Sequence, residues 1–172
     1  VGLGVTMNIA LDYAHNAQFD ILLRIDADGQ HTVESLLPII ESMVARGADV
    51  MVGARSNSLS FDSSRSITAA VLKRHMNAAA NWVSGLQLDE WHSGLIVLSR
   101  VAIERLHLQK YERYPEVEVL LRSVQLHLKV DQFSITQNQR LHGRSTITLS
   151  GGIHLAMRFY MLLLRHLIKR RA

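Results

Sequence analysis

The sequence predicts an α/β domain in which short buried strands alternate with amphipathic helices. Aliphatic runs of strand length occur at 21–25 and 50–53, and each lies between segments with helical spacing of apolar residues. Turn residues end each run, Asp-Ala-Asp-Gly after the first and Gly-Ala-Arg after the second. A chain of 172 residues, 48% hydrophobic and 20% charged, can form one globular domain with a sizeable core. The alternation favours a largely parallel sheet with flanking helices.

The same rules locate the elements in order along the chain. Apolar residues three and four positions apart predict helices over 1–15, 33–46, 67–83, 101–106, 117–128 and 153–168. Two further apolar or alternating runs predict strands over 95–98 and 130–136. Gly47 and Gly85 are expected to end the second and third helices. The serine-rich segment 57–66 and the glycine-containing segment 140–145 are expected to be loops.

Two aspartates one residue apart, Asp26 and Asp28, follow the first strand directly. Carboxylates at the end of a buried strand lose hydration, and a positive partner between them offsets that cost. Because Mg²⁺ and Mn²⁺ prefer carboxylate oxygens, a divalent cation carrying an anionic ligand is one interpretation. The other is an ordinary polar turn at Asp28-Gly29. Arg55 ends the second strand and is expected at the same edge of the sheet, where α/β proteins bind ligands.

Composition narrows the classes of function. Cysteine is absent, which excludes disulfides, thiolate metal sites and cysteine nucleophiles. The net charge of +4 is concentrated towards the C-terminal end, where no acidic residue follows Asp131. The basic residues there are Arg140, Arg144, Arg158, Arg165, Lys169, Arg170 and Arg171. Such an end suggests phosphate or an anionic membrane surface as a partner, and nucleic acid is disfavoured because no known nucleic-acid-binding motif accompanies the charges.

The last predicted helix carries a basic stripe. His154, Arg158, Arg165 and Lys169 are four, seven and four positions apart, so they share one face of a helix. The apolar run is too short and too charged to span a bilayer, which needs about 20 mostly apolar residues. A helix of this kind can lie in a membrane interface. The alternative is a helix packed on its own domain, with the arginines in water.

Five short motifs then occur in a fixed order along the chain. They are Asp26-Ala-Asp-Gly-Gln30-His31, Gly53-Ala-Arg55, Asp89 with Ser93-Gly94, Tyr114-Pro-Glu-Val-Glu118, and Arg140-Leu-His-Gly143-Arg-Ser145. In this order they resemble glycosyltransferase family 2, in particular its branch of dolichol-phosphate mannose synthase-like polyprenyl-phosphate sugar transferases. The matching segments run from Gly4 to about Ser145. The resemblance implies a nucleotide-diphospho-sugar transferase fold of the GT-A type.

The resemblance also implies a division of the chain and a set of metal ligands. Residues 1–150 correspond to the C-terminal portion of the transferase domain, because the family's opening strand and nucleoside-binding residues have no counterpart here. Residues 151–172 form the basic amphipathic helix. Asp26, Asp28 and Gln30 correspond to the ligands of a Mg²⁺ or Mn²⁺ ion that bridges the donor diphosphate.

Further residues acquire roles in substrate binding by the same resemblance. Arg55, Arg65, Arg140 and Ser145 are expected to face phosphates of the donor or acceptor, and guanidinium groups suit this because they bind two oxygens at once. Asp89 corresponds to a carboxylate on the acceptor side and is the candidate general base.

No direct role in substrate or metal binding is expected for the other polar residues near the motifs. Glu116 and Glu118 match an acidic position of the family and are expected only to position the loop or helix that carries them. His31 and His92 lie near the site in sequence and are expected to be solvated turn residues.

The expected function is therefore a metal-dependent, inverting sugar transfer from a nucleotide sugar to a polyprenyl phosphate at the cytoplasmic face of a membrane. Transfer to a glycan hydroxyl, with Asp89 as the base, is an alternative within the same fold. A non-catalytic partner module at the membrane is another. A haloacid-dehalogenase-type phosphatase also begins with strand-Asp-x-Asp-Gly, but the position after the glycine is Gln30 rather than Thr or Ser, and no Gly-Asp pair follows.

Overall fold

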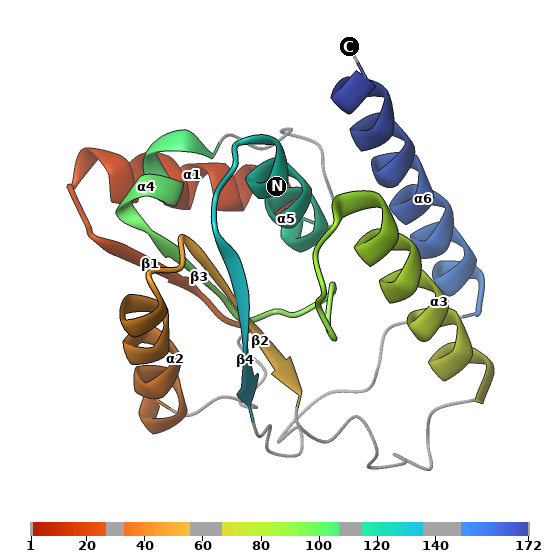
Figure 1. The fold of residues 1–172 in the computed structure, drawn as a ribbon, viewed down its shortest axis with the longest axis horizontal. Helices are drawn as coiled ribbons and strands as arrows, with labels where there is room; N and C mark the ends of the chain where they lie inside the picture. Colours follow the sequence, from red (N-terminus) through yellow and green to blue (C-terminus); the bar gives the residue numbers. More distant parts are fainter. Residues whose placement is uncertain (1, 27–32, 56–66, 107–114, 136–148, 172) are drawn as a thin grey trace.

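The structure, a computed structural model, describes residues 2–26, 33–55, 67–106, 115–135 and 149–171. These residues form six helices and one four-stranded sheet (Figure 1). The helices are α1 (Leu3–Asn16), α2 (Val33–Arg46), α3 (Ile67–Ser84), α4 (Arg100–Arg105), α5 (Pro115–Gln125) and α6 (Leu149–Arg171). The strands are β1 (Ile21–Arg24), β2 (Val50–Arg55), β3 (Ile96–Ser99) and β4 (Val130–Ile135). The α/β class is confirmed, and every predicted element occurs close to its expected bounds.

The sheet is mixed, in the order β1-β3-β2-β4. Strands β1, β2 and β4 run in one direction, but β3 lies between β1 and β2 and is antiparallel to both. Only the β2–β4 pair is parallel, whereas β1–β3 and β2–β3 are antiparallel. The expectation that neighbouring strands pair largely in parallel is therefore wrong. The reason is that β3 begins at the edge where β1 and β2 end, because Arg24 and Val52 both pair with Ile96.

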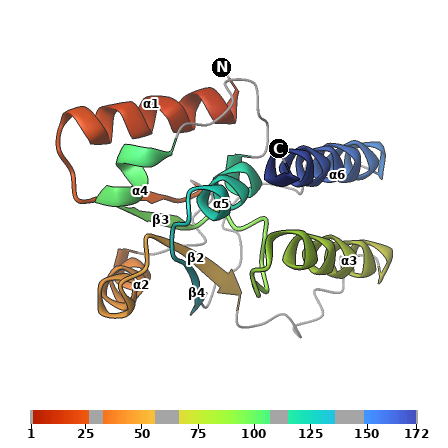
Figure 2. The same ribbon diagram turned by 45° about the horizontal axis from the view of Figure 1, so that its top comes forward.

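Residues alternate between the two faces of the sheet. On β2, Val50 and Val52 belong to one hydrophobic cluster and Met51 to the other. The cluster around Met51 is completed by Ile39 and Met43 of α2, which covers one face of the sheet (Figure 2). The cluster on the opposite face contains the buried residues of α1, α4 and α5. The period of two in the strands therefore produces a helix–sheet–helix arrangement.

Helices α3 and α6 lie side by side and extend the second helical layer away from the sheet (Figures 1 and 2). The side chains of Phe159, Leu162 and Leu163 bury the inner face of α6 in the larger cluster. His75 Nδ1 and the Tyr160 hydroxyl share a hydrogen bond of 2.5 Å between the two helices. None of the helices in the described part of the chain combines the length and hydropathy that a membrane span requires.

Two glycines expected to end helices adopt the conformation that requires glycine. Gly47 follows α2 with φ of +58°, and Gly85 follows α3 with φ of +80°. A side chain is strained at positive φ, so each glycine allows the chain to leave its helix abruptly. Gly85 thereby starts the connection that leads to β3.

Candidate functional site

Most of the predicted site residues follow strands that end at one edge of the sheet. Strands β1, β2 and β4 end there and β3 begins there, as their registers show. Asp28 and Gln30 follow β1, Arg65 follows β2, and Arg140 and Ser145 follow β4, all in segments outside the described residues. Arg55 is the last residue of β2, so its backbone lies at this edge, and its side chain is also outside the described part.

Asp26 lies against Gly94 at this edge. A Cβ atom built on Gly94 would overlap both carboxylate oxygens and the Cγ atom of Asp26. The contact follows from the antiparallel β1–β3 pairing, because Asp26 comes two residues after Arg24 and Gly94 comes two residues before its partner Ile96. Two motifs far apart in the sequence therefore meet, and glycine is the residue that leaves room for the carboxylate.

Arg24 connects Asp26 to a third motif. Its guanidinium lies 3.6 Å from Asp26 Oδ1 and donates a hydrogen bond of 3.2 Å to Glu116 Oε2. Glu116 is nearly buried in the first turn of α5, and desolvation raises the pKa of its carboxyl despite the nearby charge of Arg24. Sequence reasoning missed Arg24. The available signal was a single cation in an otherwise aliphatic strand, two positions before Asp26.

A hydrogen bond of Ser93 connects the segment just before β3 to the C-terminal half of β2. Its hydroxyl is buried and donates to the backbone carbonyl of Gly53 at 2.6 Å, and it accepts a hydrogen bond from the backbone N–H of Leu95 at 3.2 Å. Gly53 belongs to the Gly-Ala-Arg motif. Leu95 and Ile135 side chains pack close to the Gly53 Cα, so a larger residue there would displace them. Contacts among the described residues thus connect four of the five motifs, those that contain Asp26, Gly53, Ser93-Gly94 and Glu116, the last through Arg24.

Asp89 is exposed and held by two side chains from other elements. The Gln132 amide of β4 donates to Asp89 Oδ2 at 2.8 Å, and the Gln132 Oε1 atom accepts from the Asp89 backbone N–H at 2.8 Å. The Asn77 amide of α3 donates to the Asp89 carbonyl at 2.6 Å. The backbone of Asp89 is therefore held by both α3 and β4, its carboxylate is held by Gln132 of β4, and these contacts differ from those of Asp26.

His92 is not the solvated turn residue that the sequence suggested. Its ring packs on Phe159 of α6, with centroids 5.2 Å apart, and its Nε2 atom is buried without a hydrogen-bond partner among the described residues. Burial lowers the pKa of His92 to about 4, because desolvation and Lys73 outweigh the attraction of Glu90. His31 lies outside the described residues. The expectation for His92 is wrong because Phe159, which buries it, lies far along the chain.

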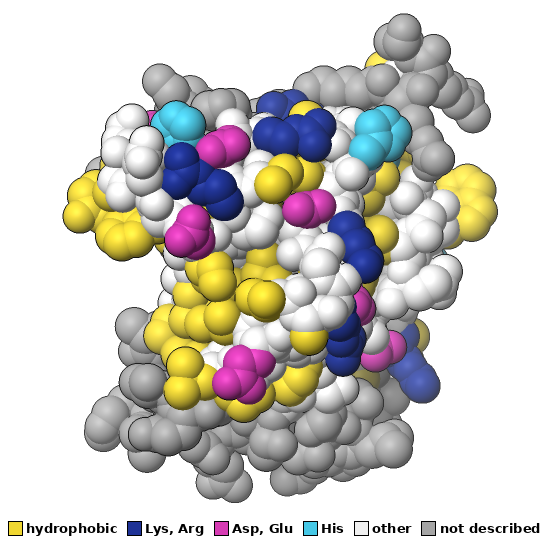
Figure 3. All heavy atoms as spheres, turned by 60° about the vertical axis from the view of Figure 1, so that its left-hand side comes forward, with side chains coloured by type: hydrophobic (Ala, Val, Ile, Leu, Met, Phe, Trp, Pro, Cys, Tyr) yellow, Lys and Arg dark blue, Asp and Glu magenta, His cyan; other side chains and the backbone are white. Residues whose placement is uncertain are grey.

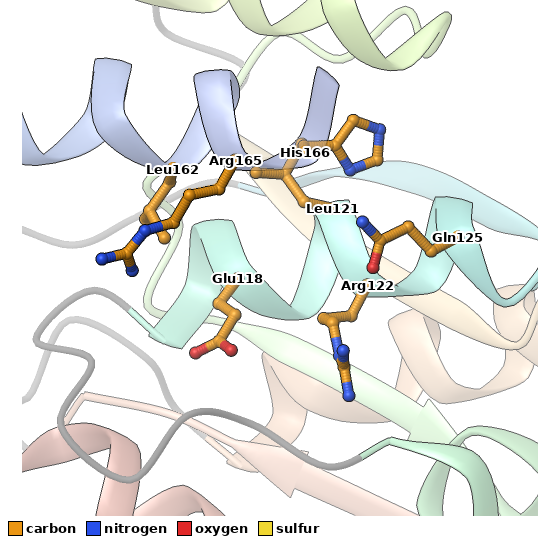
Figure 4. Close-up of a pocket in the computed structure, with 7 residues that line it drawn as sticks. All are labelled: Glu118, Leu121, Arg122, Gln125, Leu162, Arg165 and His166. Carbon is orange, nitrogen blue, oxygen red and sulfur yellow. The ribbon is translucent and has the colours of Figure 1, made fainter. Parts of the chain in front are cut away.

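A small cavity of about 40 Å³ lies between α5 and α6 (Figure 4). It is lined by Glu118, Leu121, Arg122, Gln125, Leu162, Arg165 and His166. A water molecule in the liquid occupies about 30 Å³, whereas small-molecule sites enclose roughly 300 Å³ or more. This cavity can hold water and is too small for a nucleotide sugar, so the candidate site remains at the sheet edge.

The environment of Asp26 changes one premise of the metal hypothesis. Strand β1 is an edge strand, and the Asp26 side chain is 54% exposed, so burial alone does not demand a cation beside it. Its carboxylate oxygens remain of the type that Mg²⁺ and Mn²⁺ prefer, and they are accessible. Within the described ranges, no cluster of three His, Cys, Asp or Glu side chains is suited to a metal. Asp26 is the described member of the predicted ligand set.

Comparison with known proteins supports a distant relationship to a glycosyltransferase. No family model matches the chain. The chain is similar to UDP-N-acetylglucosamine–dolichyl-phosphate N-acetylglucosaminyltransferase of Methanococcus voltae, with 23% identity over 131 residues. The similar region covers 74% of this chain and 52% of that enzyme, so the chain spans about half the length of the relative that it matches.

Proposed function

We propose that this protein is a metal-dependent glycosyltransferase of family 2, with a GT-A-type fold, that moves a sugar from a nucleotide-diphospho-sugar to a polyprenyl phosphate with inversion. The observation that carries the proposal is the convergence at Asp26. Gly94 leaves room for its carboxylate, and Arg24 links it to Glu116. Asp26, Gly94 and Glu116 belong to three of the motifs that carry the family resemblance. The distant relative acts on a dolichyl phosphate by its name, which agrees with the acceptor class.

The proposed ligands of the metal are Asp26, Asp28 and Gln30. A Mg²⁺ or Mn²⁺ ion held there would stabilise the negative charge that develops on the departing nucleoside diphosphate. Arg24 contributes a fixed cation at one side of Asp26 and so limits the positions that its carboxylate can adopt. Arg55, Arg65, Arg140 and Ser145 are the proposed contacts for the phosphates of donor and acceptor.

The role of Asp89 depends on the chemical class of the acceptor. A polyprenyl phosphate is already anionic, so it can attack the sugar without a base, and Asp89 would then only orient the site. A glycan hydroxyl must lose a proton, and Asp89 would then be the general base. One observation favours keeping this second function: Gln132 and Asn77 hold the exposed Asp89 in a defined position, as a base requires. Because a polyprenyl acceptor resides in a bilayer, we place the protein at the cytoplasmic surface of a membrane.

The test is transfer of label from radioactive nucleotide sugars. The purified protein is incubated with Mn²⁺ or Mg²⁺, a panel of labelled donors, and polyprenyl phosphate in detergent. We expect label in the lipid phase with one donor and loss of that transfer in Asp28→Ala. Gly94→Ala should lower the rate by about tenfold or more, because its Cβ displaces Asp26. Gly2→Ala is the matched control, because no atom lies within 4 Å of its Cβ.

Other outcomes distinguish the alternatives. Metal-dependent release of nucleotide with a glycan acceptor, and none with the lipid, would favour the hydroxyl reaction and predict that Asp89→Asn abolishes it. No transfer from any donor to any acceptor would contradict the proposal and favour a non-catalytic partner module. Equal rates in Gly94→Ala and Gly2→Ala would remove Asp26 from the active site.

A further inference from the structure

Arg24 places a fixed positive charge beside Asp26, the described member of the proposed metal-ligand set. Its Nη2 atom is 3.6 Å from Asp26 Oδ1, which is close enough for an ion pair but too long for a hydrogen bond. Its Nη1 atom instead donates a hydrogen bond of 3.2 Å to Glu116 Oε2. Glu116 therefore holds the guanidinium, and the looser contact leaves Asp26 able to bind another cation.

The exposed fractions of the three side chains differ in the same way as their contacts. Glu116 is 12% exposed and Arg24 is 19% exposed, whereas Asp26 is 54% exposed. The pair of Arg24 with Glu116 lies mostly out of water, where breaking it would leave a charge uncompensated. The contact of Arg24 with Asp26 is weaker, because solvent screens it. A ligand that arrives from solvent can therefore reach Asp26 while Glu116 keeps the guanidinium in place.

Ion pairs elsewhere on the molecule join one cation to one carboxylate. Figure 3 shows a face on which Lys and Arg side chains lie beside Asp and Glu side chains. Pairs of this kind are Arg46–Asp131 and Arg100–Glu104, with N···O distances of 3.2 and 2.6 Å between partly exposed side chains. Such surface pairs contribute little to stability. Arg24 differs from them, because one carboxylate holds it while it faces a second carboxylate at the candidate site.

The fixed guanidinium has opposite effects on two classes of ligand. It repels a divalent cation that binds Asp26 alone, because both are positive and only a few ångströms apart. It attracts a phosphate group at the same place, since a guanidinium remains charged and binds two oxygens at once. A divalent cation that carries a diphosphate brings negative charge towards Arg24, and this attraction offsets the repulsion of the cation.

We propose that Arg24 makes Asp26 bind a divalent cation together with a diphosphate in preference to the cation alone. Arg24 is then a further substrate-binding residue, outside the ligand set and the phosphate contacts named above, and Glu116 is the positioning residue that holds it. By linkage, the diphosphate raises the affinity for the cation by the same factor as the cation raises the affinity for the diphosphate. This inference rests on the proposed function, because it requires a metal at Asp26.

Two binding measurements on the purified 172-residue protein test the proposal. The electron paramagnetic resonance signal of free Mn²⁺ gives the affinity for the cation alone. Equilibrium dialysis of labelled pyrophosphate at saturating Mg²⁺ gives the affinity for the diphosphate. We expect Arg24→Met to bind Mn²⁺ about tenfold more tightly, because the repulsion is removed, and pyrophosphate about tenfold more weakly. A damaged fold would weaken both affinities, so opposite changes from one substitution exclude that explanation.

Variants of Glu116 and Arg46 complete the comparison. Glu116→Gln removes the carboxylate that holds Arg24, so the guanidinium can move onto Asp26, and Mn²⁺ should bind more weakly than in the unmodified protein. The double variant Arg24→Met with Glu116→Gln has no uncompensated buried charge, and it should bind Mn²⁺ more tightly than Glu116→Gln alone. Arg46→Met, which removes a cation from a surface pair, should change neither affinity. Circular dichroism checks that each variant is folded.

The outcomes separate this inference from the proposed function. Equal Mn²⁺ affinities in Arg24→Met and Arg46→Met would overturn the inference, and so would weaker binding of both ligands by a folded Arg24→Met. The proposed function survives either result, because Asp26 can then bind the metal without selection by Arg24. Mn²⁺ binding that Asp26→Ala leaves unchanged would contradict the metal ligand itself and would overturn both.

Discussion

Arg24 forms ion pairs with two carboxylates of the candidate site and so connects them. Its side chain is 19% exposed and lies between an exposed carboxylate, Asp26, and a nearly buried one, Glu116. Burial raises the pKa of Glu116, which means that the fold disfavours its charged form even with Arg24 present. Arg24 therefore compensates a charge that is costly to bury, and at the same time it positions the carboxylate proposed to bind metal.

Arg24→Met should destabilise the protein, because it leaves the Glu116 carboxylate without its cation. We expect a loss of about 3 kcal/mol in the free energy of unfolding, measured with urea. The double variant Arg24→Met with Glu116→Gln should recover a large part, since the buried charge is then gone. Arg46→Met, which removes an exposed ion pair with Asp131, should cost less than about 1 kcal/mol. Equal losses for Arg24→Met and Arg46→Met would contradict this account.

His92 makes the stability of the fold sensitive to acid. Its pKa is about 4 in the folded protein and near 6.5 when solvated, so the unfolded chain binds the proton more tightly between these values. The contribution of His92 to the free energy of unfolding should therefore be largest above pH 6.5 and fall towards pH 4, by up to about 1.4 kcal/mol per pH unit. In His92→Gln, which is neutral at every pH, this contribution to the slope should disappear. Urea unfolding at several pH values measures it, with the exposed His15→Gln as the control that should keep the slope.

At the scale of elements, the connection between α3 and β3 organises the site, and Asn81 holds it. The Asn81 amide donates to the Leu88 carbonyl at 3.0 Å, and its Oδ1 accepts from the Leu88 N–H at 3.1 Å and from Trp91 Nε1 at 2.7 Å. Trp91 is fully buried. The hydrogen bonds of Asn81 therefore connect the end of α3 to the segment that precedes Ser93 and Gly94 at the sheet edge.

Asn81→Ala should destabilise the protein by about 3 kcal/mol, because the buried indole N–H and the Leu88 backbone lose their partners. Asn81→Asp keeps an acceptor for both N–H groups and should fall between Ala and the unmodified protein. Gln87→Ala, at an exposed position of the same connection, should change stability by less than about 0.5 kcal/mol. Thermal and urea unfolding provide the comparison. An Asn81→Ala variant as stable as Gln87→Ala would show that other contacts hold the connection.

Elements were predictable from the sequence, but contacts between distant elements were not. The period of apolar residues and the glycines at 47 and 85 locate helices and strands, because these signals are local. The direction of β3 depends on which edge of the sheet the connection reaches, and no local pattern encodes that. The Arg24–Glu116 pair joins residues 92 positions apart, and His92 is buried by a residue of the last helix. The roles proposed for Asp28, Gln30, Arg65, Arg140 and Ser145 stay predictions of the family resemblance.

At the scale of the whole molecule, one loop connects the sheet edge to the paired helices α3 and α6. The loop from Asp89 to Gly94 touches both, because Asn77 of α3 donates to Asp89 while Gly94 contacts Asp26. His92 of the same loop packs on Phe159 of α6. If the basic face of α6 lies in a membrane interface, these contacts hold the site at a defined orientation to the membrane. An acceptor embedded in that membrane would then meet the site at high effective concentration.

This arrangement predicts that binding of α6 to a membrane affects the rate of sugar transfer only when the acceptor is embedded in that membrane. With polyprenyl phosphate embedded in anionic vesicles, Leu164→Glu should lower the rate of sugar transfer by about tenfold, in proportion to its weaker vesicle binding. With a short-chain prenyl phosphate dissolved in buffer, the same variant should transfer sugar at the unmodified rate, because residue 164 lies on the exposed face of α6, opposite its buried face. The control Val44→Glu, which adds the same charge on the exposed side of α2, should behave as the unmodified protein with both acceptors. A loss of rate with the dissolved acceptor would mean that Leu164→Glu disturbs the site itself, and an unchanged rate with vesicles would separate docking from catalysis.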